Sequence, residues 1–359
     1  MLDRPSAPLV DAHWLDFAVQ HLDPTFSFTR TLARVVAIRR ETADITTLVL
    51  APNGRFRGFV AGQYVPLRVV IGGVVHERCY SPTSEPHERG ILAITVKRQP
   101  LGTVSRWVAD TAAVGDVIEI GPAAGDFVLP DADAEPGRAM PLLLIAGGSG
   151  ITAVRSLARA ALQRDANADA VLLYYARRRA DFAFAAELED LAAHHARFRV
   201  HFLPQMLDDG RAPAGRFSAA HLAAWAPDYA QRATYLCGPD GLSNAVTRHW
   251  ADVGLAHRLR REAFGPTPDD DQAERVAASI SFRRSVLTVE STAATLLAAA
   301  EDAGLRPATG CRMGICRTCT CTKVSGTVRD RVTGAIDSAA GSRIRICVSE
   351  PLGPVTLDL

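Results

Sequence analysis

The sequence lacks several features that would mark it for a common partner or compartment. Its 40 Lys and Arg residues balance 39 Asp and Glu, so no strong field attracts nucleic acid or anionic lipid. Aromatic residues make up only 6%, which disfavours stacking platforms for single strands. The most apolar run, Pro141–Ala146, is far too short to span a bilayer. The start has no apolar core behind a basic end, so we expect a soluble, cytoplasmic protein without a signal peptide.

Cysteine is scarce and odd in number. Seven cysteines in a chain with no export signal argue against a disulfide framework. Four of them fall between Cys311 and Cys321, which indicates a metal or redox centre near the C-terminus. Hydrophobic residues reach 48% of the 359 positions, enough to bury cores, and this length predicts two or three domains.

The first half of the chain has the pattern of an antiparallel β-barrel. From Thr31, short alternating runs are broken by Gly and Pro, and regularly spaced short strands of this kind are typical of barrels and sandwiches. Strands are expected at Ile45–Leu50, Tyr64–Ile71, Ile91–Lys97 and Val117–Ile120. The region ends near Pro130, before an acidic stretch with Pro and Gly that is typical of a linker.

From Pro141 the pattern changes to alternating strands and helices. Repeated βα units predict a doubly wound parallel sheet. The expected strands are Leu142–Ala146, Val171–Tyr175, Arg199–Leu203 and Thr234–Cys237, and the expected helices are Ile151–Gln163, Phe182–His194 and Leu242–Val253. Gly265–Gln272 follows, and its Pro and acidic residues predict a second, exposed linker.

The last segment begins with alternation over Ser279–Val289, which predicts strand. A helix is expected over Ser291–Gly304, because glycine suits the left-handed position after a helix end. Further strands are expected at Thr320–Val324 and Arg343–Cys347. The predicted organisation is therefore an extension (1–27), a β-barrel domain (28–130), an α/β domain (138–263), a linker (264–275) and a C-terminal domain (276–359).

The N-terminal extension carries one apolar pattern. Trp14, Phe17, Ala18 and Leu22 can share one face of a helix. Such a stripe either packs on the body of the protein or contacts a partner, and the sequence leaves both open.

Cys311, Cys316, Cys319 and Cys347 have a spacing with a specific chemical meaning. Four residues, two residues and 27 residues separate them in turn, which is the plant-type [2Fe–2S] spacing. Two irons need four thiolates, and Gly314 lets the loop turn its N–H groups toward the bridging sulfides. A structural zinc site is the alternative, but zinc ligands usually come in two close pairs. We expect the fifth thiol, Cys321, to pack as a small hydrophobe.

On these cysteines, residues 276–359 resemble the plant-type ferredoxin domain. The resemblance rests on the CxxGxCxxC loop and the distant Cys347, and it covers the whole segment. It implies a β-grasp fold and a cluster that carries one electron at a time.

Arg78-Cys79-Tyr80-Ser81 precede Pro82 at the end of an expected strand. A flavin offers a phosphate for an Arg fork, a ring that stacks on an aromatic side chain and an N5 atom for a small donor. The string resembles the RxYS motif of the ferredoxin–NADP⁺ reductase family. The resemblance implies that Arg78 holds the pyrophosphate, Tyr80 stacks on the ring and Ser81 reaches N5.

Two further segments support a flavin. Gly102-Thr103-Val104-Ser105 open an expected helix whose N-terminus can bind phosphate, and in the family this loop holds the flavin diphosphate, which favours FAD over FMN. The family's Gly-Pro-x-x-Gly-x-Phe segment is present as Gly121, Pro122, Gly125 and Phe127. The predicted flavin site comprises Arg78, Cys79, Tyr80, Ser81, Val96, Lys97, Gly102, Thr103, Val104, Ser105 and Phe264. Phe264 lies in Glu262-Ala263-Phe264-Gly265, which resembles the family's closing segment, but it could equally anchor the linker.

The expected strand Leu142–Ala146 runs into Gly147-Gly148-Ser149-Gly150-Ile151-Thr152. Glycines let a backbone approach a pyrophosphate, and a helix N-terminus favours its negative charge. The string is not the GxGxxG fingerprint. It resembles the GGxGIT loop of the same reductase family, with Ala153 where the family often has Pro.

Two positions near other strand ends refine the nucleotide site. Cys237-Gly238-Pro239 resemble the family's CGP motif, whose Cys lies against the nicotinamide, although a buried structural Cys is the alternative. Arg177 follows a strand where the 2′ end of the adenine ribose should fall, and arginine there suits a 2′-phosphate. We therefore expect NADPH rather than NADH, the alternative being a solvated basic run over Arg177–Arg179.

These motifs together predict an NAD(P)H-dependent oxidoreductase with FAD, a [2Fe–2S] cluster and NADPH as cofactors. Hydride passes from NADPH to the flavin beside Tyr80, Ser81 and Cys237, and single electrons then pass through the cluster to an external acceptor. A flavin and iron–sulfur redox sensor is the alternative from another class, and the complete nicotinamide site argues against it.

The acceptor is expected to be another protein and not a nucleic acid. The domain order resembles reductases of oxygenases, hydroxylases and fatty-acyl desaturases. The extension around His13–Phe17 resembles that of bacterial reductases that feed membrane-bound desaturases. A desaturase is thus the expected partner, and a Rieske or di-iron hydroxylase or oxygenase is the alternative.

Overall fold

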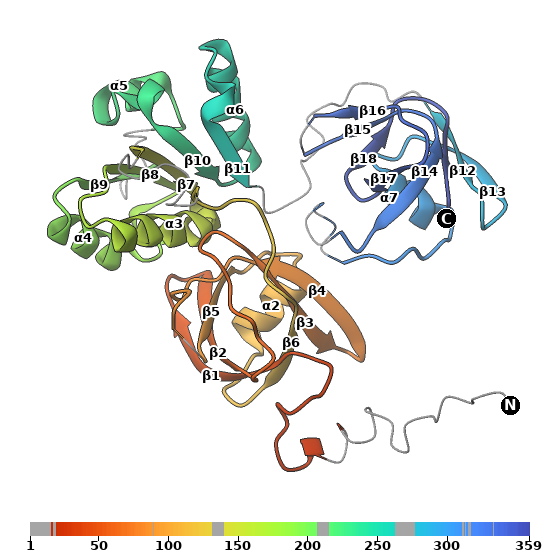
Figure 1. Cartoon of the computed structure of the whole chain (residues 1–359), viewed down its shortest axis with the longest axis horizontal. Coiled ribbons are helices and arrows are strands. Elements are labelled where there is room, and N and C mark those ends of the chain that lie inside the picture. Colours follow the sequence, from red (N-terminus) through yellow and green to blue (C-terminus); the bar gives the residue numbers. More distant parts are fainter. Residues whose placement is uncertain are drawn as a thin grey trace, which may run out of the picture.

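The computed structural model describes residues 16, 19–88, 90–130, 140–206, 215–262, 277–310, 312, 314, 317–332 and 334–359. They form three bodies, each built on its own main sheet (Figure 1). Of the apolar stripe expected in the extension, Trp14, Phe17 and Ala18 lie outside the described residues. Leu22 is 90% exposed, so this member of the stripe does not pack on the body.

The first body is the expected antiparallel barrel. Its strands lie in the order β4-β3-β6-β1-β2-β5, and a bridge between Pro82 and Ile94 joins the two ends of the sheet. Alternate residues face inward, and Val104 and Val108 of α2 complete the core. The elements are β1 (Leu32–Arg40), β2 (Ile45–Pro52), β3 (Val65–Ile71), β4 (Val74–Tyr80), β5 (Leu92–Lys97), α2 (Thr103–Asp110) and β6 (Val117–Ile120).

The second body is the expected doubly wound sheet. All its strands are parallel, in the order β11-β10-β7-β8-β9. The strands are β7 (Leu142–Gly147), β8 (Ala170–Ala176), β9 (Phe198–Pro204), β10 (Ala233–Cys237) and β11 (Leu259–Glu262). The helices are α3 (Ile151–Arg164), α4 (Ala185–His194), α5 (Ala219–Trp225) and α6 (Asp240–Asp252).

Helices cover both faces of this parallel sheet (Figure 1). Leu144 and its same-face neighbours pack with α3 and α4, whereas Leu143 and Ile145 pack with α5 and α6. The chain proceeds from β7 to β8 and β9 on one side and returns to β10 and β11 on the other. The carboxyl ends of β7 and β10 therefore form the switch point at which such sheets bind ligands.

In its described residues, the third body is a mixed sheet with one helix, as a β-grasp domain requires. Its main sheet has the order β13-β12-β19-β14-β17, with β12 and β19 parallel, and a small sheet has the order β16-β15-β18. The elements are β12 (Ala278–Phe282), β13 (Leu287–Ser291), α7 (Leu296–Asp302), β14 (Thr320–Ser325), β15 (Val328–Asp330), β16 (Ile336–Asp337), β17 (Ser342–Arg345), β18 (Ser349–Pro351) and β19 (Val355–Leu357).

Several element boundaries differ from the sequence-based expectation. The alternation over Ser279–Val289 is a hairpin of β12 and β13, since the chain reverses before Val286, which has a φ of 48°. Helix α7 begins later than expected because the Thr295 hydroxyl accepts a hydrogen bond from the Ala298 N–H and caps it there. Strand β1 and helix α5 were not among the expected elements.

Within the described part of the chain, no helix has both the length and the apolar character needed to cross a membrane.

Candidate flavin, nicotinamide and iron–sulfur sites

The Arg78–Ser81 motif lies at the end of an edge strand of the barrel. Pairing of β3 with β4 places Tyr80 opposite Val65. Arg78 and Tyr80 share one face of β4, and Cys79, only 8% exposed, points to the other. Burial raises the pKa of the Tyr80 phenol, so this ring stays neutral at physiological pH.

Ser81 has an unsatisfied hydroxyl. The residue is 2% exposed, and its Oγ is buried with no hydrogen-bond partner. A buried polar atom left unpaired costs about 1–3 kcal/mol, so native structures keep one mainly where a ligand or a reaction uses it. The motif therefore fits a flavin that offers Ser81 a polar partner.

The remaining predicted flavin residues divide by what they can offer. Val96 and Val104 point into the barrel core, so only their backbones can face a cofactor. Gly102 precedes α2, whose N-terminus has no side-chain cap, and its N–H groups suit a phosphate. Ser105 Oγ already accepts a hydrogen bond from the Gln99 N–H at 3.1 Å, which fixes the loop before the helix. Phe264 lies outside the described residues.

The glycine loop and the Cys-Gly-Pro segment pack directly on each other. A Cβ at Gly150 would lie 2.0 Å from the Cys237 carbonyl oxygen, a distance that no side chain tolerates. A Cβ at Gly147 would lie 2.7 Å from Pro239 Cδ. Thr152 Oγ1 donates to the Ser149 carbonyl at 3.0 Å and closes the turn. The two motifs, far apart in sequence, therefore form one surface at the switch point.

Lys97 brings the barrel to this same loop. Gly148 adopts a left-handed conformation with φ of 52°, and a Cβ placed there would lie 3.9 Å from Lys97 Nζ. Lys97 also pairs with Asp44 at 3.3 Å. One predicted flavin-site residue thus lies beside the predicted nucleotide loop.

Cys237, Glu262 and Ser81 converge between the two domains. Cys237 and Glu262 are partners in the β10–β11 register. Burial, reinforced by the nearby Glu262 carboxylate, raises the pKa of the Cys237 thiol well above its usual range. Burial also raises the pKa of Glu262 to about 8, and the Ser81 hydroxyl partly offsets this rise. Ser81 is close enough for that influence, although its Oγ makes no hydrogen bond of regular geometry.

Glu262 was not among the residues assigned to the site from the sequence. Its segment was recognised, but only the aromatic was given a role. The signal that could have found it is positional: a lone acid ends the strand that pairs with Cys237, at the ligand-binding edge of the sheet.

A second set of contacts fastens the nucleotide domain to the flavin motif. Arg155, only 7% exposed, donates to the Thr83 carbonyl at 2.6 Å and forms a bidentate pair with Glu187. Ser156 Oγ donates to the Pro82 carbonyl at 2.8 Å. Helix α3 is thereby hydrogen-bonded to the residues that directly follow Ser81, which holds the end of β4 against the glycine loop.

Arg177 lies where the sequence placed it, directly after β8. It is exposed, and its carbonyl accepts a hydrogen bond from the Met206 N–H at 2.9 Å. Among the described residues its guanidinium has no ion-pair partner, so it can reach a ligand at the carboxyl edge of the sheet.

Of the four expected cluster cysteines, the structure describes Cys319 and Cys347. Each is 4% exposed, and their sulfur atoms lie 3.0 Å apart. Cys311 and Cys316 lie outside the described residues. Gly314 has a φ of 74°, and a Cβ there would meet Val348 Cγ2 at 2.9 Å, so the loop needs glycine at this point. Two adjacent buried thiols from separate segments fit a shared cluster.

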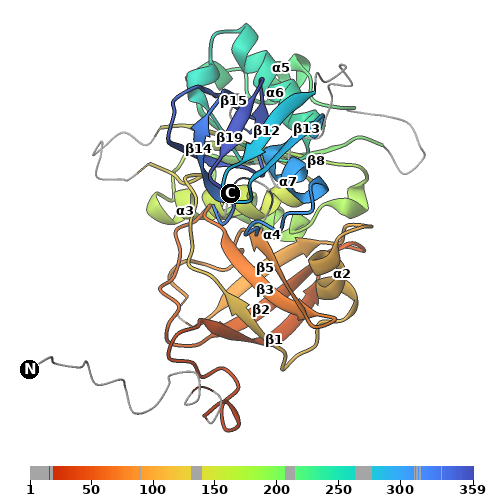
Figure 2. The ribbon, with the colours of Figure 1, turned by 90° about the vertical axis from the view of Figure 1, so that its right-hand side faces the viewer.

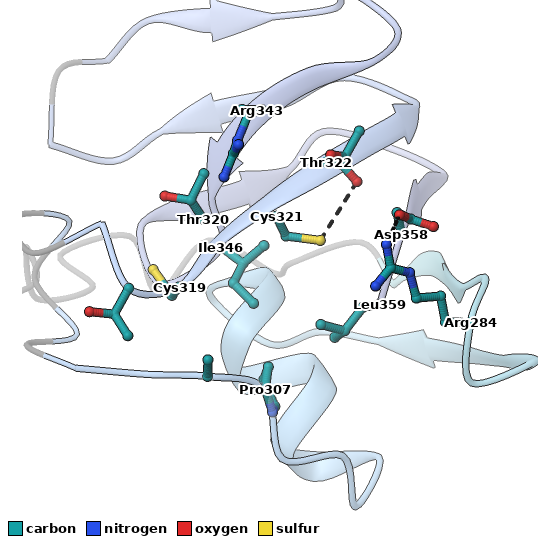
Figure 3. Close-up of a pocket in the computed structure, with 12 residues that line it drawn as sticks. Arg284, Pro307, Cys319, Thr320, Cys321, Thr322, Arg343, Ile346, Asp358 and Leu359 are labelled. Carbon is teal, nitrogen blue, oxygen red and sulfur yellow. Dashed lines mark hydrogen bonds and ion pairs between the residues drawn. The ribbon is translucent and has the colours of Figure 1, made fainter. Parts of the chain in front are cut away.

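Cys321 does not join the cysteine pair. Its Sγ contacts the Thr322 carbonyl at 3.6 Å, and burial raises its pKa. It lines a pocket that Cys319 also lines (Figure 3).

A flavin-type barrel, a doubly wound nucleotide domain and a cysteine-bearing β-grasp domain define a modular electron-transfer reductase. Family models agree with each part. The oxidoreductase FAD-binding domain matches residues 32–128, the oxidoreductase NAD-binding domain matches 144–248, and the 2Fe-2S iron-sulfur cluster binding domain matches 283–352.

Several known proteins that are similar over nearly the whole chain are reductases. An NADPH oxidoreductase of Mycobacterium tuberculosis is 34% identical, with 99% of this chain and 90% of the relative covered. A glycine betaine monooxygenase reductase subunit of Pseudomonas aeruginosa is 32% identical, with 93% and 96% covered. The solved structure of phthalate dioxygenase reductase aligns with a TM-score of 0.61 at 25% identity, covering 92% of this chain and 98% of that one.

The chain therefore belongs to the ferredoxin–NADP⁺ reductase superfamily, among the reductases with a C-terminal [2Fe–2S] ferredoxin domain. It is an NAD(P)H-dependent oxidoreductase whose cofactors are FAD, a [2Fe–2S] cluster and a pyridine nucleotide.

Proposed function

We propose that this chain is the reductase component of an oxygenase system and draws its electrons from NADPH. The observation that carries the proposal is the convergence of Ser81 from the barrel with Cys237 and Glu262 from the nucleotide domain. It is supported by relatives whose names identify them as reductases of a glycine betaine monooxygenase and of a stachydrine N-demethylase. The desaturase expected from the sequence has no such support, so the oxygenase is preferred.

In this proposal the barrel binds FAD through the predicted residues. Arg78 and the N-terminus of α2 hold the diphosphate, Tyr80 stacks on the ring and Ser81 turns its unpaired hydroxyl toward N5. When bound, FAD accepts a hydride and releases its two electrons one at a time. The protein contributes orientation and a dry junction, which lower the barrier by removing the cost of bringing the rings together.

The nucleotide domain presents NADPH to that junction. The Gly147–Gly150 loop and the start of α3 receive the pyrophosphate, and Arg177 reaches the 2′-phosphate. Cys237 stays a neutral thiol, because its pKa is raised. It packs against the nicotinamide without adding a negative charge beside the hydride donor.

In this proposal the protonated Glu262 carboxyl donates a hydrogen bond to Ser81. With a pKa of about 8, its carboxyl is mostly protonated at neutral pH and can donate to Ser81 Oγ. The Ser81 hydroxyl would then have its own hydrogen free to donate to the flavin. Glu262 thus acts as a positioning residue for the Ser81 proton.

In this proposal the ferredoxin domain passes the electrons on to the partner protein. Cys311, Cys316, Cys319 and Cys347 hold the cluster, and Arg345, which donates to the Gly314 carbonyl, holds the loop in place. The partner receives single electrons from this loop.

The acceptor class can be tested by direct competition. We would mix the NADPH-reduced protein anaerobically with a Rieske-type oxygenase component, a haem oxygenase component or a membrane-bound acyl desaturase, and record the rate of acceptor reduction. We expect fast reduction of one of the oxygenase components. Faster reduction of the desaturase than of either oxygenase component would contradict the proposal and support the desaturase partner expected from the sequence.

The nucleotide preference rests on Arg177. Replacing Arg177 by Ala should raise the KM for NADPH by about 10-fold or more and leave that for NADH almost unchanged, because a charge-assisted hydrogen bond is lost. Arg179→Ala, two residues further on, is the matched control. Equal effects of Arg177→Ala on both nucleotides would remove the basis for the NADPH preference.

A further inference from the structure

The surface of the ferredoxin domain is hollowed beside a predicted cluster ligand. A pocket of about 370 Å³ lies there, with Cys319 and Arg343 near one end and Arg284 and Asp358 near the other (Figure 3). A second pocket of about 450 Å³ contains Arg306 and shares Pro307 with the first. The two hollows therefore form one continuous surface along the segment that leads into the cysteine loop.

Three exposed arginines lie on this surface or beside it in the sequence. Arg306, Arg317 and Arg343 are all exposed, and within the described part of the chain none of them has an ion-pair partner. Arg317 lies two residues before Cys319, and Arg343 lies on β17, the strand that pairs with β14 next to that cysteine. We call these three residues the arginine surface.

The nearby carboxylates do not neutralise this surface, because most already have partners. Glu301 pairs with Arg312 at 2.6 Å, Asp330 pairs with Arg345 at 2.5 Å, and Asp358 pairs with two arginines at 2.6 Å. Among the described residues, Asp302 is an exposed carboxylate of this region without a partner. The balance around Cys319 is therefore positive.

The three residues of the arginine surface stay exposed with the whole chain present. Arg261 of the nucleotide domain donates to the carbonyl of Val332, so the ferredoxin domain is attached by its β15–β16 side. Leu359, which lines the first pocket, ends the chain on the opposite, outward side (Figures 1 and 2). The surface is thus open to a separate molecule while the domain remains attached.

We propose that the arginine surface docks the electron-accepting protein through a carboxylate-rich patch on that partner. This inference rests on the proposed function and adds to it the chemistry of the partner's surface. Guanidinium groups form forked hydrogen bonds with carboxylates, and unpaired charges of one sign steer an oppositely charged partner at low salt. Each NADPH oxidised to NADP⁺ yields two electrons and one proton, so two one-electron acceptors are reduced in turn.

Cytochrome c and its succinylated form are matched probes, because succinylation converts a basic protein into an acidic one on the same haem. We expect the second-order reduction rate of succinylated cytochrome c to fall about 10-fold between low and high salt. The rate for native cytochrome c should stay constant or rise. Binding of oxidised succinylated cytochrome c, measured by titration calorimetry without NADPH, should weaken with salt in parallel.

Two double variants separate the local charge from the total charge. Arg306→Glu with Arg343→Glu should lower both affinity and rate for succinylated cytochrome c about 10-fold or more at low salt. The control, Arg39→Glu with Arg248→Glu, makes the same change in net charge on the other two domains and should change them less than about 2-fold. NADPH–ferricyanide activity and the electron paramagnetic resonance signal of the cluster should be unchanged in both.

The outcomes distinguish the two proposals. Equal losses in the two double variants, or binding independent of salt, would overturn the docking surface. A protein that binds succinylated cytochrome c at the arginine surface but never reduces it or any other acceptor would refute the proposed reductase function and leave the docking surface intact.

Discussion

The flavin–nucleotide junction and the attachment of the ferredoxin domain are built differently. At the junction, helix α3 grips the segment after Ser81 through Arg155, Ser156 and Gln163, and Phe127 packs on Tyr235 with ring centroids 5.5 Å apart. Between the nucleotide and ferredoxin domains, the hydrogen bond found within the described residues is that from Arg261 to Val332. The first pair of domains is tightly joined, and the second is joined lightly.

This difference follows what each transfer requires. Hydride transfer needs reacting atoms within about 3–3.5 Å and in alignment, so a small displacement is costly. Transfer of single electrons needs no such contact. The ferredoxin domain can therefore be attached through few contacts and still serve both its own flavin and an external partner.

Removing the cluster should separate the functions of the two regions most clearly. Cys347→Ser takes away one of the four predicted cluster ligands, and we expect reduction of cytochrome c to fall about 100-fold or more. NADPH–ferricyanide activity, which needs only the junction, should remain close to that of the wild type. Both are read from initial rates on the same preparation, and loss of the two activities together would mean that the cluster domain supports the junction.

A substitution at Gly150 should disrupt the packing at the flavin–nucleotide junction. Gly150→Ala places a methyl group 2.0 Å from the Cys237 carbonyl, so α3 or β10 must move, at a cost of about 3 kcal/mol or more. Flavin reduction by NADPH should slow, and the Tm should drop. Gly241→Ala in α6, where a Cβ meets nothing within 4 Å, is the matched control and should be neutral or stabilising. Similar behaviour of the two variants would contradict the close packing of the two motifs.

Removing the contact of Arg155 on α3 with the segment after Ser81 should have a smaller effect on flavin reduction. Arg155→Ala leaves the Thr83 carbonyl and part of Glu187 without a donor, which should lower the free energy of unfolding by about 2 kcal/mol. The KM for NADPH should change little while the rate of flavin reduction falls, since orientation rather than binding is lost. Arg164→Ala, on the exposed contact with the Pro130 carbonyl, is the control. An unchanged rate of flavin reduction would show that this contact does not align the domains.

The pH dependence of stability should report Glu262. Its pKa is raised to about 8 by burial, from an ordinary carboxyl value of about 4.3 in the unfolded chain. Between these values the folded state holds a proton that the unfolded state has lost. Glu262 thus contributes stability at low pH that disappears as the pH rises toward 8, by up to about 1.4 kcal/mol per pH unit.

Glu262→Gln supplies the reference for this effect. The wild type should lose stability relative to the variant as pH increases from 5 to 8, measured by denaturant unfolding at each pH. A constant difference between the two proteins across this range would mean that Glu262 ionises normally. The conservative amide also keeps the shape of the side chain, so packing is not the variable.

The sequence predicted most of the fold because its patterns were local. The βα repeat from Leu142 onward fixed the parallel sheet, and the cysteine spacing identified the ferredoxin domain before any contact was known. The sequence did not predict the turn at Val286 between β12 and β13, and it predicted that α7 begins earlier than Leu296. Both depend on single residues, an unusual φ and the Thr295 cap, that periodicity does not register.

The site was predicted only in part, for a similar reason. Motif residues such as Ser81, Gly150 and Cys237 could be assigned to the predicted site because each lies in a recognisable string. Arg155 and Glu262 were not, because their significance arises from partners distant in sequence: Arg155 contacts Thr83, and Glu262 lies beside Cys237 and Ser81. Arg155 lies in no recognised motif, and the motif that contains Glu262 assigned a role only to Phe264.

The central claim is that electrons pass from the junction to the cluster within one chain. The most direct test is anaerobic rapid mixing with NADPH under a regenerating system, following flavin absorbance and the electron paramagnetic resonance signal of the reduced cluster. We predict loss of the oxidised-flavin absorbance first and the cluster signal second, with the second absent in Cys347→Ser. A cluster that dithionite reduces but NADPH never does, while the flavin is fully reduced, would contradict the account.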